Sequence, residues 1–161
     1  MYTLTGVMSM ADCRQPMNGE LTDVKRNALL AAAEAALRNA YAPYSGLRVG
    51  AVVLSTSGGR HAGCNVENRA YPLGGCAEHH AIAAAVQAEG PGLRLRAVAI
   101  AARDVEGRAV PIPPCGGCRQ KLMEFGEGLT VVFLGQNGAV AIHALRDLLP
   151  ASFELPVSTS G

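Results

Sequence analysis

The sequence predicts one α/β domain of three layers, α/β/α, in which helices cover both faces of a five-stranded mixed sheet. Three observations predict it. Segments with helical Ala/Leu spacing alternate with short Val-rich segments in the order αββαβαββα. The chain has 161 residues, 49% of them hydrophobic, which is enough for one apolar core. It also contains no internal repeat and no low-complexity segment of the kind that indicates a solenoid or an array.

The first helix is predicted to follow a short tail. Residues 1–20 lack hydrophobic periodicity, so we expect a loosely ordered tail there and a domain over residues 21–157. Thr22 is a candidate N-cap for a helix that extends to Ala40. Apolar residues recur along it at helical spacing, at Leu29, Leu30, Ala33 and Leu37.

A β-hairpin is predicted next. Segments 47–54 and 60–66 are apolar and rich in Val, and they flank the turn residues 57–59, Ser-Gly-Gly. The remaining expected elements are, in chain order, a loop (67–75), a helix from Cys76 to near Gly90, a strand (96–102), a loop (103–114), a helix (115–125), a strand (129–134), a strand (139–143) and a brief helix near 145–150. The strand-helix-strand order around 115–125 predicts parallel pairing of strands 96–102 and 129–134.

Charge and cysteine content indicate which partners and which cellular compartment to expect. The formal net charge is +1 and no window holds a run of Lys or Arg, so nucleic acid is not an expected partner. We find neither a secretory leader pattern nor the roughly 18 uninterrupted apolar residues of a membrane span. Five cysteines, an odd number in a chain large enough to fold without disulfides, favour a reducing compartment. We therefore expect a cytoplasmic protein without a membrane partner.

Three of these cysteines predict a zinc site. Cys76 begins one predicted helix, and Cys115 and Cys118 lie in the first turn of another, where a spacing of three places both sulfurs on one side. Three protein ligands leave the fourth tetrahedral position open, as a catalytic zinc requires. Zinc with three thiolates has a formal charge of −1, which the positive ends of two helices would offset in part.

Glu78 is the candidate catalytic acid and base. A carboxylate beside an activated water can take its proton and deliver it to a substrate. On a regular helix, however, two residues are separated by about 200°, so the expected role requires first-turn geometry with the substrate over the helix end. A structural zinc site, or simple packing, is the alternative for a C-x-x-C with a third cysteine. Cys-Ala-Glu followed by Pro-Cys-x-x-Cys instead matches the signature of nucleobase deaminases.

The resemblance extends well beyond these residues. From about Leu21 to Leu155 the chain resembles the small homotetrameric cytidine deaminases, which implies a cytidine-deaminase-like fold and one zinc per subunit of a homotetramer. Four segments carry the resemblance: YAPYSGLRVGA (41–51), GCNVENRAYPLGGCAE (63–78), PCGGCRQKLMEFG (114–126) and LLPASF (148–153).

The resemblance also implies roles for residues outside the zinc site. Asn65 and Glu67 would hydrogen-bond the ribose hydroxyls, the backbone around Ala77 would contact the base, and Phe153 would reach the pocket of a neighbouring subunit. Asn65 and Glu67 are two apart at a strand end, so both side chains can point to one side and bind a vicinal diol. Without the resemblance, this pair is a weak signal, and its residue types favour a solvated strand end over a binding site.

The chain departs from the family pattern at three positions. His79 occupies the place of an Arg that offsets thiolate charge, Leu47 replaces a pocket Phe, and Pro113 replaces a Ser. We expect His79 to donate a hydrogen bond to a ligand thiolate and tune the metal, with a solvated helix-face histidine as the alternative. Leu47 and Pro113 suggest a pocket altered near the exocyclic amine.

The expected function is hydrolytic deamination of cytidine and deoxycytidine to uridine-type products, with a role in pyrimidine salvage. Activated water would attack C4, and Glu78 would move a proton to N3 and then to the leaving amine. Two alternatives stay open: deamination of N4-modified cytidines or of a cytosine-type nucleoside antibiotic, and a non-catalytic zinc-binding protein. Arg119 and Gln120 could support the site electrostatically, although a salt bridge on a solvated face would give the same sequence.

Overall fold

The computed structural model describes residues 21–153 and residue 155. Its sheet has five strands in the order β2-β1-β3-β4-β5. The elements, in chain order, are α1 (Asp23–Ala36), η2 (Leu37–Asn39), β1 (Arg48–Ser55), β2 (Arg60–Cys64), η3 (Tyr71–Leu73), α2 (Ala77–Glu89), β3 (Leu95–Arg103), α3 (Gly116–Met123), β4 (Thr130–Leu134), β5 (Val140–Ala144) and α4 (Leu145–Leu148).

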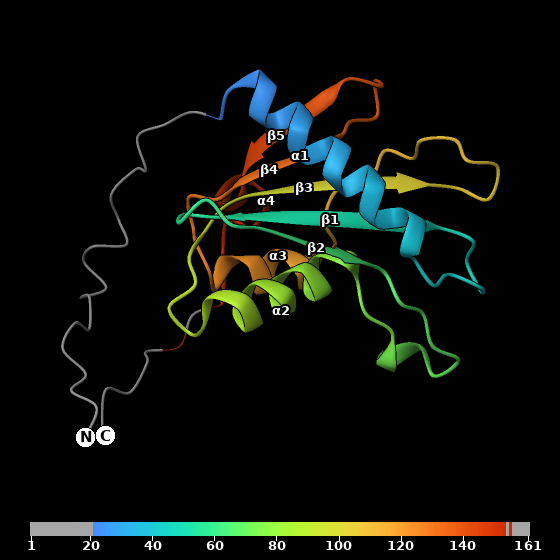
Figure 1. Cartoon of the computed structure of the whole chain (residues 1–161), viewed down its shortest axis with the longest axis horizontal. Coiled ribbons are helices and arrows are strands. Elements are labelled where there is room, and N and C mark those ends of the chain that lie inside the picture. The colour runs from blue at the N-terminus through green and yellow to red at the C-terminus, as the bar shows by residue number, and fades with distance from the viewer. Residues whose placement is uncertain (1–20, 154, 156–161) are drawn as a thin grey trace.

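The sheet separates two helical layers, which confirms the predicted three-layer fold. Figure 1 shows α1 on one face of the sheet and α2 with α3 on the other. The β1–β2, β1–β3 and β4–β5 pairs are antiparallel, whereas β3 and β4 are parallel, as the strand-helix-strand order predicts. Because α2 and α3 lie on the same face, their N-terminal ends can contribute to one site.

Strand alternation assigns the core residues to the two faces. In β1, Val49, Ala51 and Val53 belong to the core cluster under α2 and α3. Val52 and Leu54, at the intervening positions, belong to the cluster under α1. This alternation, repeated in β3 and β4, gives the central strands two buried faces and explains why their sequences are almost continuously apolar.

Two glycines let helix backbones come close to the sheet. A Cβ at Gly50 would lie 2.1 Å from the carbonyl oxygen of Ala33 in α1. A Cβ at Gly63 would lie 2.3 Å from the amide nitrogen of Ala81 and 2.5 Å from the carbonyl oxygen of Ala77, both in α2. The second contact seats the first turns of α2 directly on β2. It therefore fixes the height of that helix end above the sheet.

Several element boundaries differ from those predicted. The first helix begins with the Thr22 side chain accepting from Lys25 N, as predicted, but its α-helical part ends at Ala36. A short 3₁₀ turn, η2, tightens the backbone up to Asn39 in place of helix to Ala40. A further 3₁₀ turn, η3, lies inside the predicted loop 67–75.

The second strand ends at Cys64, before the predicted end at residue 66, because the chain changes hydrogen-bond partners. Asn65 N still donates to Val49 O, but the next residues leave the edge of β1. Val66 pairs with Gly75 in both directions, and Glu67 N donates to Tyr41 O. This exchange of partners turns residues 65–67 toward the loops at the end of the sheet.

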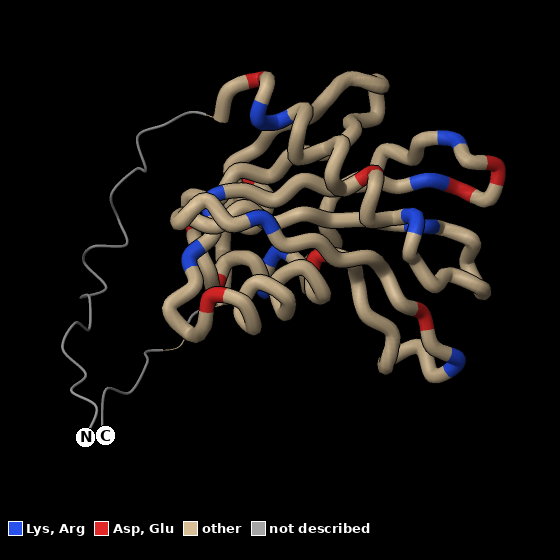
Figure 2. The backbone as a smooth tube through the Cα atoms, in the orientation of Figure 1, with Lys and Arg blue, Asp and Glu red and all other residues tan. Residues whose placement is uncertain are grey.

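Charged residues are mixed over the surface of the described chain. Figure 2 shows Lys and Arg interspersed with Asp and Glu over several elements, without a basic stripe along one face of the part described. None of the helices in residues 21–153 has the length and apolar character needed to cross a membrane.

Candidate metal centre and substrate pocket

Two helix N-termini bring the three predicted zinc ligands together. Cys76 is the N-cap of α2 and Cys115 is the N-cap of α3, so each precedes its helix by one residue and is not the first helical residue. Cys118 follows in the first turn of α3 and is buried, whereas Cys76 and Cys115 are exposed. The three sulfur atoms all lie within 4.8 Å of one another, and those of Cys76 and Cys115 are 4.0 Å apart.

These distances fit a zinc ion. A tetrahedral Zn–S length of about 2.3 Å separates two ligand sulfurs by about 3.8 Å, close to the spacing found here. No other group of three or more potential metal-binding His, Cys, Asp or Glu side chains occurs among the described residues. The donor set and its open side therefore suit a zinc site with three protein ligands.

Hydrogen bonds prepare the thiols for a cation. Hydrogen bonding from Cys118, and to a smaller extent from Cys115, lowers the pKa of Cys76 to about 6, although burial acts in the opposite direction. The charge of Lys121, on α3, also lowers the pKa of Cys76. The same hydrogen bond with Cys76, together with burial, raises the pKa of Cys118 above its ordinary value. The lowered pKa favours the thiolate form of Cys76, which is the form that binds metals.

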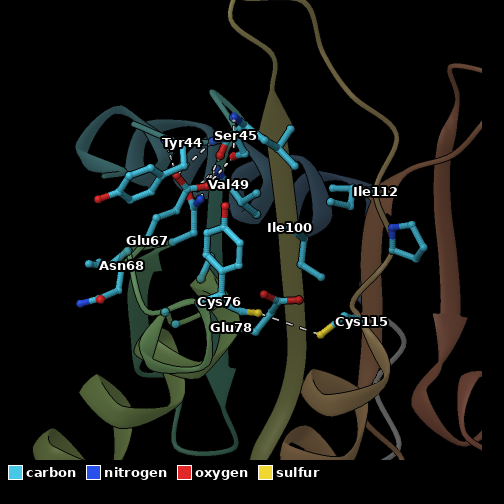
Figure 3. Close-up of a pocket in the computed structure, with 18 residues that line it drawn as sticks. Tyr44, Ser45, Val49, Glu67, Asn68, Cys76, Glu78, Ile100, Ile112 and Cys115 are labelled. Carbon is cyan, nitrogen blue, oxygen red and sulfur yellow. Dashed lines mark hydrogen bonds between the residues drawn. The ribbon is translucent and has the colours of Figure 1, made fainter. Parts of the chain in front are cut away.

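Glu78 lies beside these sulfurs, although regular helical spacing alone does not predict it. It sits in the first turn of α2, and its side chain is only 4% exposed. Figure 3 shows its carboxylate between Cys76 and Cys115, facing the same pocket. Burial, and the charge of Cys76, raise the pKa of Glu78. A buried carboxyl with a raised pKa next to an open metal position suits proton transfer.

The pocket is a cavity of about 570 Å³ with a metal end and a polar end. Cys76, Glu78 and Cys115 form the first, and Tyr44, Ser45 and Glu67 lie at the other, as Figure 3 shows. The remaining lining residues that bear on function include Leu47, Val49, Asn65, Asn68, Tyr71, Ala77, Ile100, Ile112 and Pro113. An apolar wall between two polar ends is the usual form of a site for a small heterocyclic ligand.

Glu67 holds a loop at the polar end of the pocket. Its Oε2 accepts from the backbone nitrogens of Tyr44 (2.9 Å) and Ser45 (3.2 Å), and its Oε1 accepts from the Ser45 hydroxyl. These bonds, led by the one from the Ser45 hydroxyl, lower the pKa of Glu67. The carboxylate therefore stays charged and keeps the loop against the pocket.

Asn65 connects the same region to β1. Its Oδ1 accepts from Val49 N (2.8 Å) and its Nδ2 donates to Leu47 O (2.9 Å). The predicted ribose pair, Asn65 and Glu67, thus lines one end of the cavity and also organises the backbone around it.

The predicted residues His79 and Phe153 lie away from the cavity lining. His79 is exposed, and its ring stacks on that of His80 with centroids 5.5 Å apart. Burial, followed by the charge of Lys121, lowers the pKa of His79, which favours its neutral form. The expected hydrogen bond to a thiolate is not among the contacts of the described residues. Phe153 is 69% exposed in the monomer, so a contact with a neighbouring subunit remains a prediction.

Several pocket residues have no clear signal in the sequence of their own, although they lie in segments that carry the family resemblance. Tyr44, Ser45, Asn68 and Tyr71 lie in loops without periodicity, and only the position of Gly46 (φ +69°) marks the turn that carries the first two. The charge of Lys121 also lowers the pKa of Cys76 from a position that looks like an ordinary helix surface. The folded structure alone shows that these loop residues lie in the pocket lining.

Comparisons of the sequence and of the fold with known proteins all find deaminases. Residues 23–134 match the family described as the cytidine and deoxycytidylate deaminase zinc-binding region. A cytidine deaminase of Sporosarcina psychrophila is 40% identical over 127 residues, covering 78% of this chain and 88% of that protein. A cytidine deaminase of Mycobacterium tuberculosis is 40% identical over 135 residues, covering 84% and 94%. The crystal structure of a Burkholderia pseudomallei cytidine deaminase superposes with a TM-score of 0.69 at 42% identity, covering 79% of this chain and 98% of that one.

Proposed function

This chain belongs to the cytidine and deoxycytidylate deaminase family, and from that premise we propose that it is a zinc-dependent enzyme that hydrolyses the exocyclic amine of cytidine and deoxycytidine. One cytidine and one water give one uridine and one ammonia. The observation that carries the proposal is the cluster of three sulfurs within 4.8 Å beside a buried glutamate, at one end of a nucleoside-sized cavity.

The cofactor is one zinc ion, which Cys76, Cys115 and Cys118 would hold. Bound there, zinc would supply the Lewis acid that makes a water molecule nucleophilic at neutral pH. The N-terminal ends of α2 and α3 face the thiolates and reduce the cost of gathering negative charge.

Glu78 would carry the proton. Its carboxylate takes a proton from the attacking water and gives it to N3 of the base. It then takes the remaining proton of the new C4 hydroxyl and delivers it to the amine nitrogen as the C4–N bond breaks, which leaves the C4 carbonyl of the product. Burial and the Cys76 charge favour its protonated form, so that it can hold the proton between the two transfers. Retention of a buried acid beside the metal argues against a purely structural zinc site.

Asn65 and Glu67 would bind the ribose with the hydrogen-bonding capacity that remains to them. A carboxylate offers about four acceptor directions, and the loop uses three of those on Glu67. The Asn65 side chain uses one acceptor site and one N–H donor in its hydrogen bonds with Val49 N and Leu47 O. Each side chain can therefore still bind one hydroxyl. Backbone at Ala77 would meet the base, and Leu47 would pack against the nucleoside.

Assembly and cellular role complete the proposal. We propose a homotetramer in which Phe153 reaches a neighbouring subunit's pocket, supported by the exposed apolar side chains of Tyr71 (79%), Leu73 (74%) and Phe153 around the pocket and the chain end. The four described cysteines are unpaired, as expected in a reducing cytoplasm. A role in pyrimidine salvage follows from the nucleoside substrate. We propose residues 21–157 as the deaminase domain, and residues 1–20 lie outside the described part.

The proposal is tested by ultraviolet-monitored deamination of cytidine, deoxycytidine and N4-methylcytidine, with zinc content measured on the same protein. Rapid loss of cytidine absorbance with one zinc per chain is the expected result. If only the N4-modified substrate is consumed, the enzyme is a deaminase of modified cytidines. Leu47 and Pro113 in the pocket lining would then explain that specificity. Bound zinc without turnover of any of the three would contradict the proposal.

A further inference from the structure

Cys115 is held weakly by its own neighbours in the chain. As the N-cap of α3 it makes no side-chain capping hydrogen bond. Gly116 and Gly117 follow it, and a Cβ at either position would meet open space, so no side-chain packing restrains these two residues. Two glycines in a first helical turn leave the backbone with more conformations than any other pair would. A ligand at this point needs support from elsewhere.

Arg119 provides contacts at both peptide groups that flank Cys115. Its backbone N–H donates to Cys115 O (3.0 Å), which is an ordinary helical bond. Its side-chain Nε donates to Pro114 O (2.8 Å), the carbonyl of the peptide that enters Cys115. One residue thereby fixes the peptide planes on either side of the ligand's Cα.

The same guanidinium also reaches the C-terminal part of the fold. Its Nη1 donates to Leu148 O (2.9 Å), at the last residue of α4. The neighbouring Gln120 continues this connection, because its side-chain amide both donates to Phe153 O (2.8 Å) and accepts from Phe153 N (3.0 Å). Both acceptors of Arg119 are backbone carbonyls, so this residue does not act through a surface salt bridge.

We propose that Arg119 is a positioning residue for the zinc ligand Cys115, and that it connects the metal centre to the last residue of α4. This inference rests on the proposed zinc site. The planar guanidinium is suited to the task because it presents donors in a fixed fork and remains charged. A lysine at this position presents its three donors from a single nitrogen and lacks the fixed fork whose Nε and Nη1 reach two separate carbonyls.

The test compares Arg119→Met and Arg119→Lys with Arg146→Met, a control at an exposed arginine of α4. The rate of zinc release to a chromophoric chelator is measured first. Loss of a residue that orients a metal ligand typically costs about 10- to 100-fold in metal affinity, so we expect release to accelerate by that order in Arg119→Met, by less in Arg119→Lys, and to stay unchanged in the control. The visible spectrum of the Co²⁺-substituted protein should shift in the same order.

Further measurements separate positioning from general stability. Circular dichroism and thermal unfolding of the zinc-free proteins show whether each variant folds, and Arg119→Lys provides the test if Arg119→Met does not. At saturating zinc, kcat should fall while KM changes little, because Cys115 lies at the metal end of the pocket. Unchanged zinc release and Co²⁺ spectrum in folded Arg119 variants would overturn the inference and leave the proposed function standing. Wild-type protein that binds no zinc would contradict the proposed function itself.

Discussion

At the scale of single residues, the proposed chemistry depends on Glu78, a carboxyl group whose burial destabilises its charged form. Glu78 is one of only two buried polar or charged residues in the described core, the other being Ser55. Desolvation raises its pKa, and the Cys76 thiolate raises it further. Fold stability gains nothing from an acid in that position, whereas proton transfer requires one that can hold and release a proton near neutral pH.

Replacing Glu78 by Gln should therefore remove activity without removing the metal. We expect kcat to fall by about 10²- to 10⁴-fold, the usual contribution of general acid and base catalysis, with zinc content unchanged. Steady-state deamination of cytidine and metal analysis of the same sample measure both. Glu124→Gln, at an exposed glutamate just after α3, is the matched control. Activity within a few-fold of wild type in Glu78→Gln would assign the proton transfer to another group.

A second prediction at this scale concerns the Glu67 carboxylate and pH. Its pKa lies below its ordinary value of 4.5 because it accepts from the Ser45 hydroxyl and from two backbone N–H groups. A lowered pKa means that its stabilising effect is complete above pH 4.5 and is lost as pH falls through the lower, folded-state pKa. The protection of the Tyr44 and Ser45 amides against hydrogen exchange, relative to an unstructured peptide at the same pH, should thus stay high at neutral pH and fall only in strong acid.

Glu67→Gln is the matching variant, since an amide has one acceptor oxygen where the carboxylate has two. We expect faster exchange at the same two amides at neutral pH, together with a higher KM for cytidine. Asp104→Asn, which removes a carboxylate from a loop closed by its own hydrogen bonds, is the control. Slow exchange at Tyr44 and Ser45 in Glu67→Gln would mean that the loop does not depend on the charge.

At the scale of elements, the site forms where the N-termini of α2 and α3 meet on one face of the sheet (Figure 1). α2 contributes Cys76 and Glu78, and α3 contributes Cys115 and Cys118. The position of α2 depends on its close contact with β2 at Gly63, because any side chain there would strike the helix backbone. The geometry of the metal site is therefore sensitive to the spacing of one helix and one strand.

Gly63→Ala tests that dependence. The added Cβ would lie 2.3 Å from Ala81 N, a contact that is relieved only if α2 and β2 move apart. Overpacking of this kind costs about 1–3 kcal/mol of unfolding free energy, and we also expect weaker zinc retention. Urea denaturation and metal analysis give the two quantities. Gly92→Ala, where a Cβ meets nothing within 4 Å, should change neither. Wild-type stability in Gly63→Ala would show that the helix has room to move.

At the scale of the whole molecule, one sheet with two apolar faces unites all these parts. α1 covers one face and takes no part in the pocket lining, while the opposite face carries α2 and α3. The first described residues belong to this scaffold, since Leu21 is 4% exposed and Thr22 caps α1. The domain we propose therefore begins with them.

Deletion of residues 1–20 should leave a folded, active enzyme. Because the N-cap and the buried Leu21 are kept, we expect the free energy of unfolding to change by no more than about 0.5 kcal/mol, the range typical of changes outside the core. Urea denaturation and cytidine turnover are the measurements, and the full-length chain is the reference. A loss of several kcal/mol would mean that the segment packs against the domain, and the proposed boundary would then be wrong.

The sequence by itself determined the order of elements, the three-layer class and the cysteines that gather. Each depends on local spacing: apolar periodicity distinguishes helices from strands, and a cysteine at or near the start of a helix has a known direction relative to the axis. The ends of the elements depend on more than local spacing. The second strand ends earlier than predicted because Val66 forms its backbone hydrogen bonds with Gly75 and not with β1.

Only the tertiary structure decided how the parts meet. It placed Glu78 beside the thiolates where regular spacing alone predicts divergence, and it left the ring of His79 stacked on His80. It also joined Arg119 to Pro114 and Leu148, two carbonyls that no motif connects. Such contacts follow from helix seating and loop closure over the whole sheet, which depend on long-range packing, so residue spacing along the chain does not encode them.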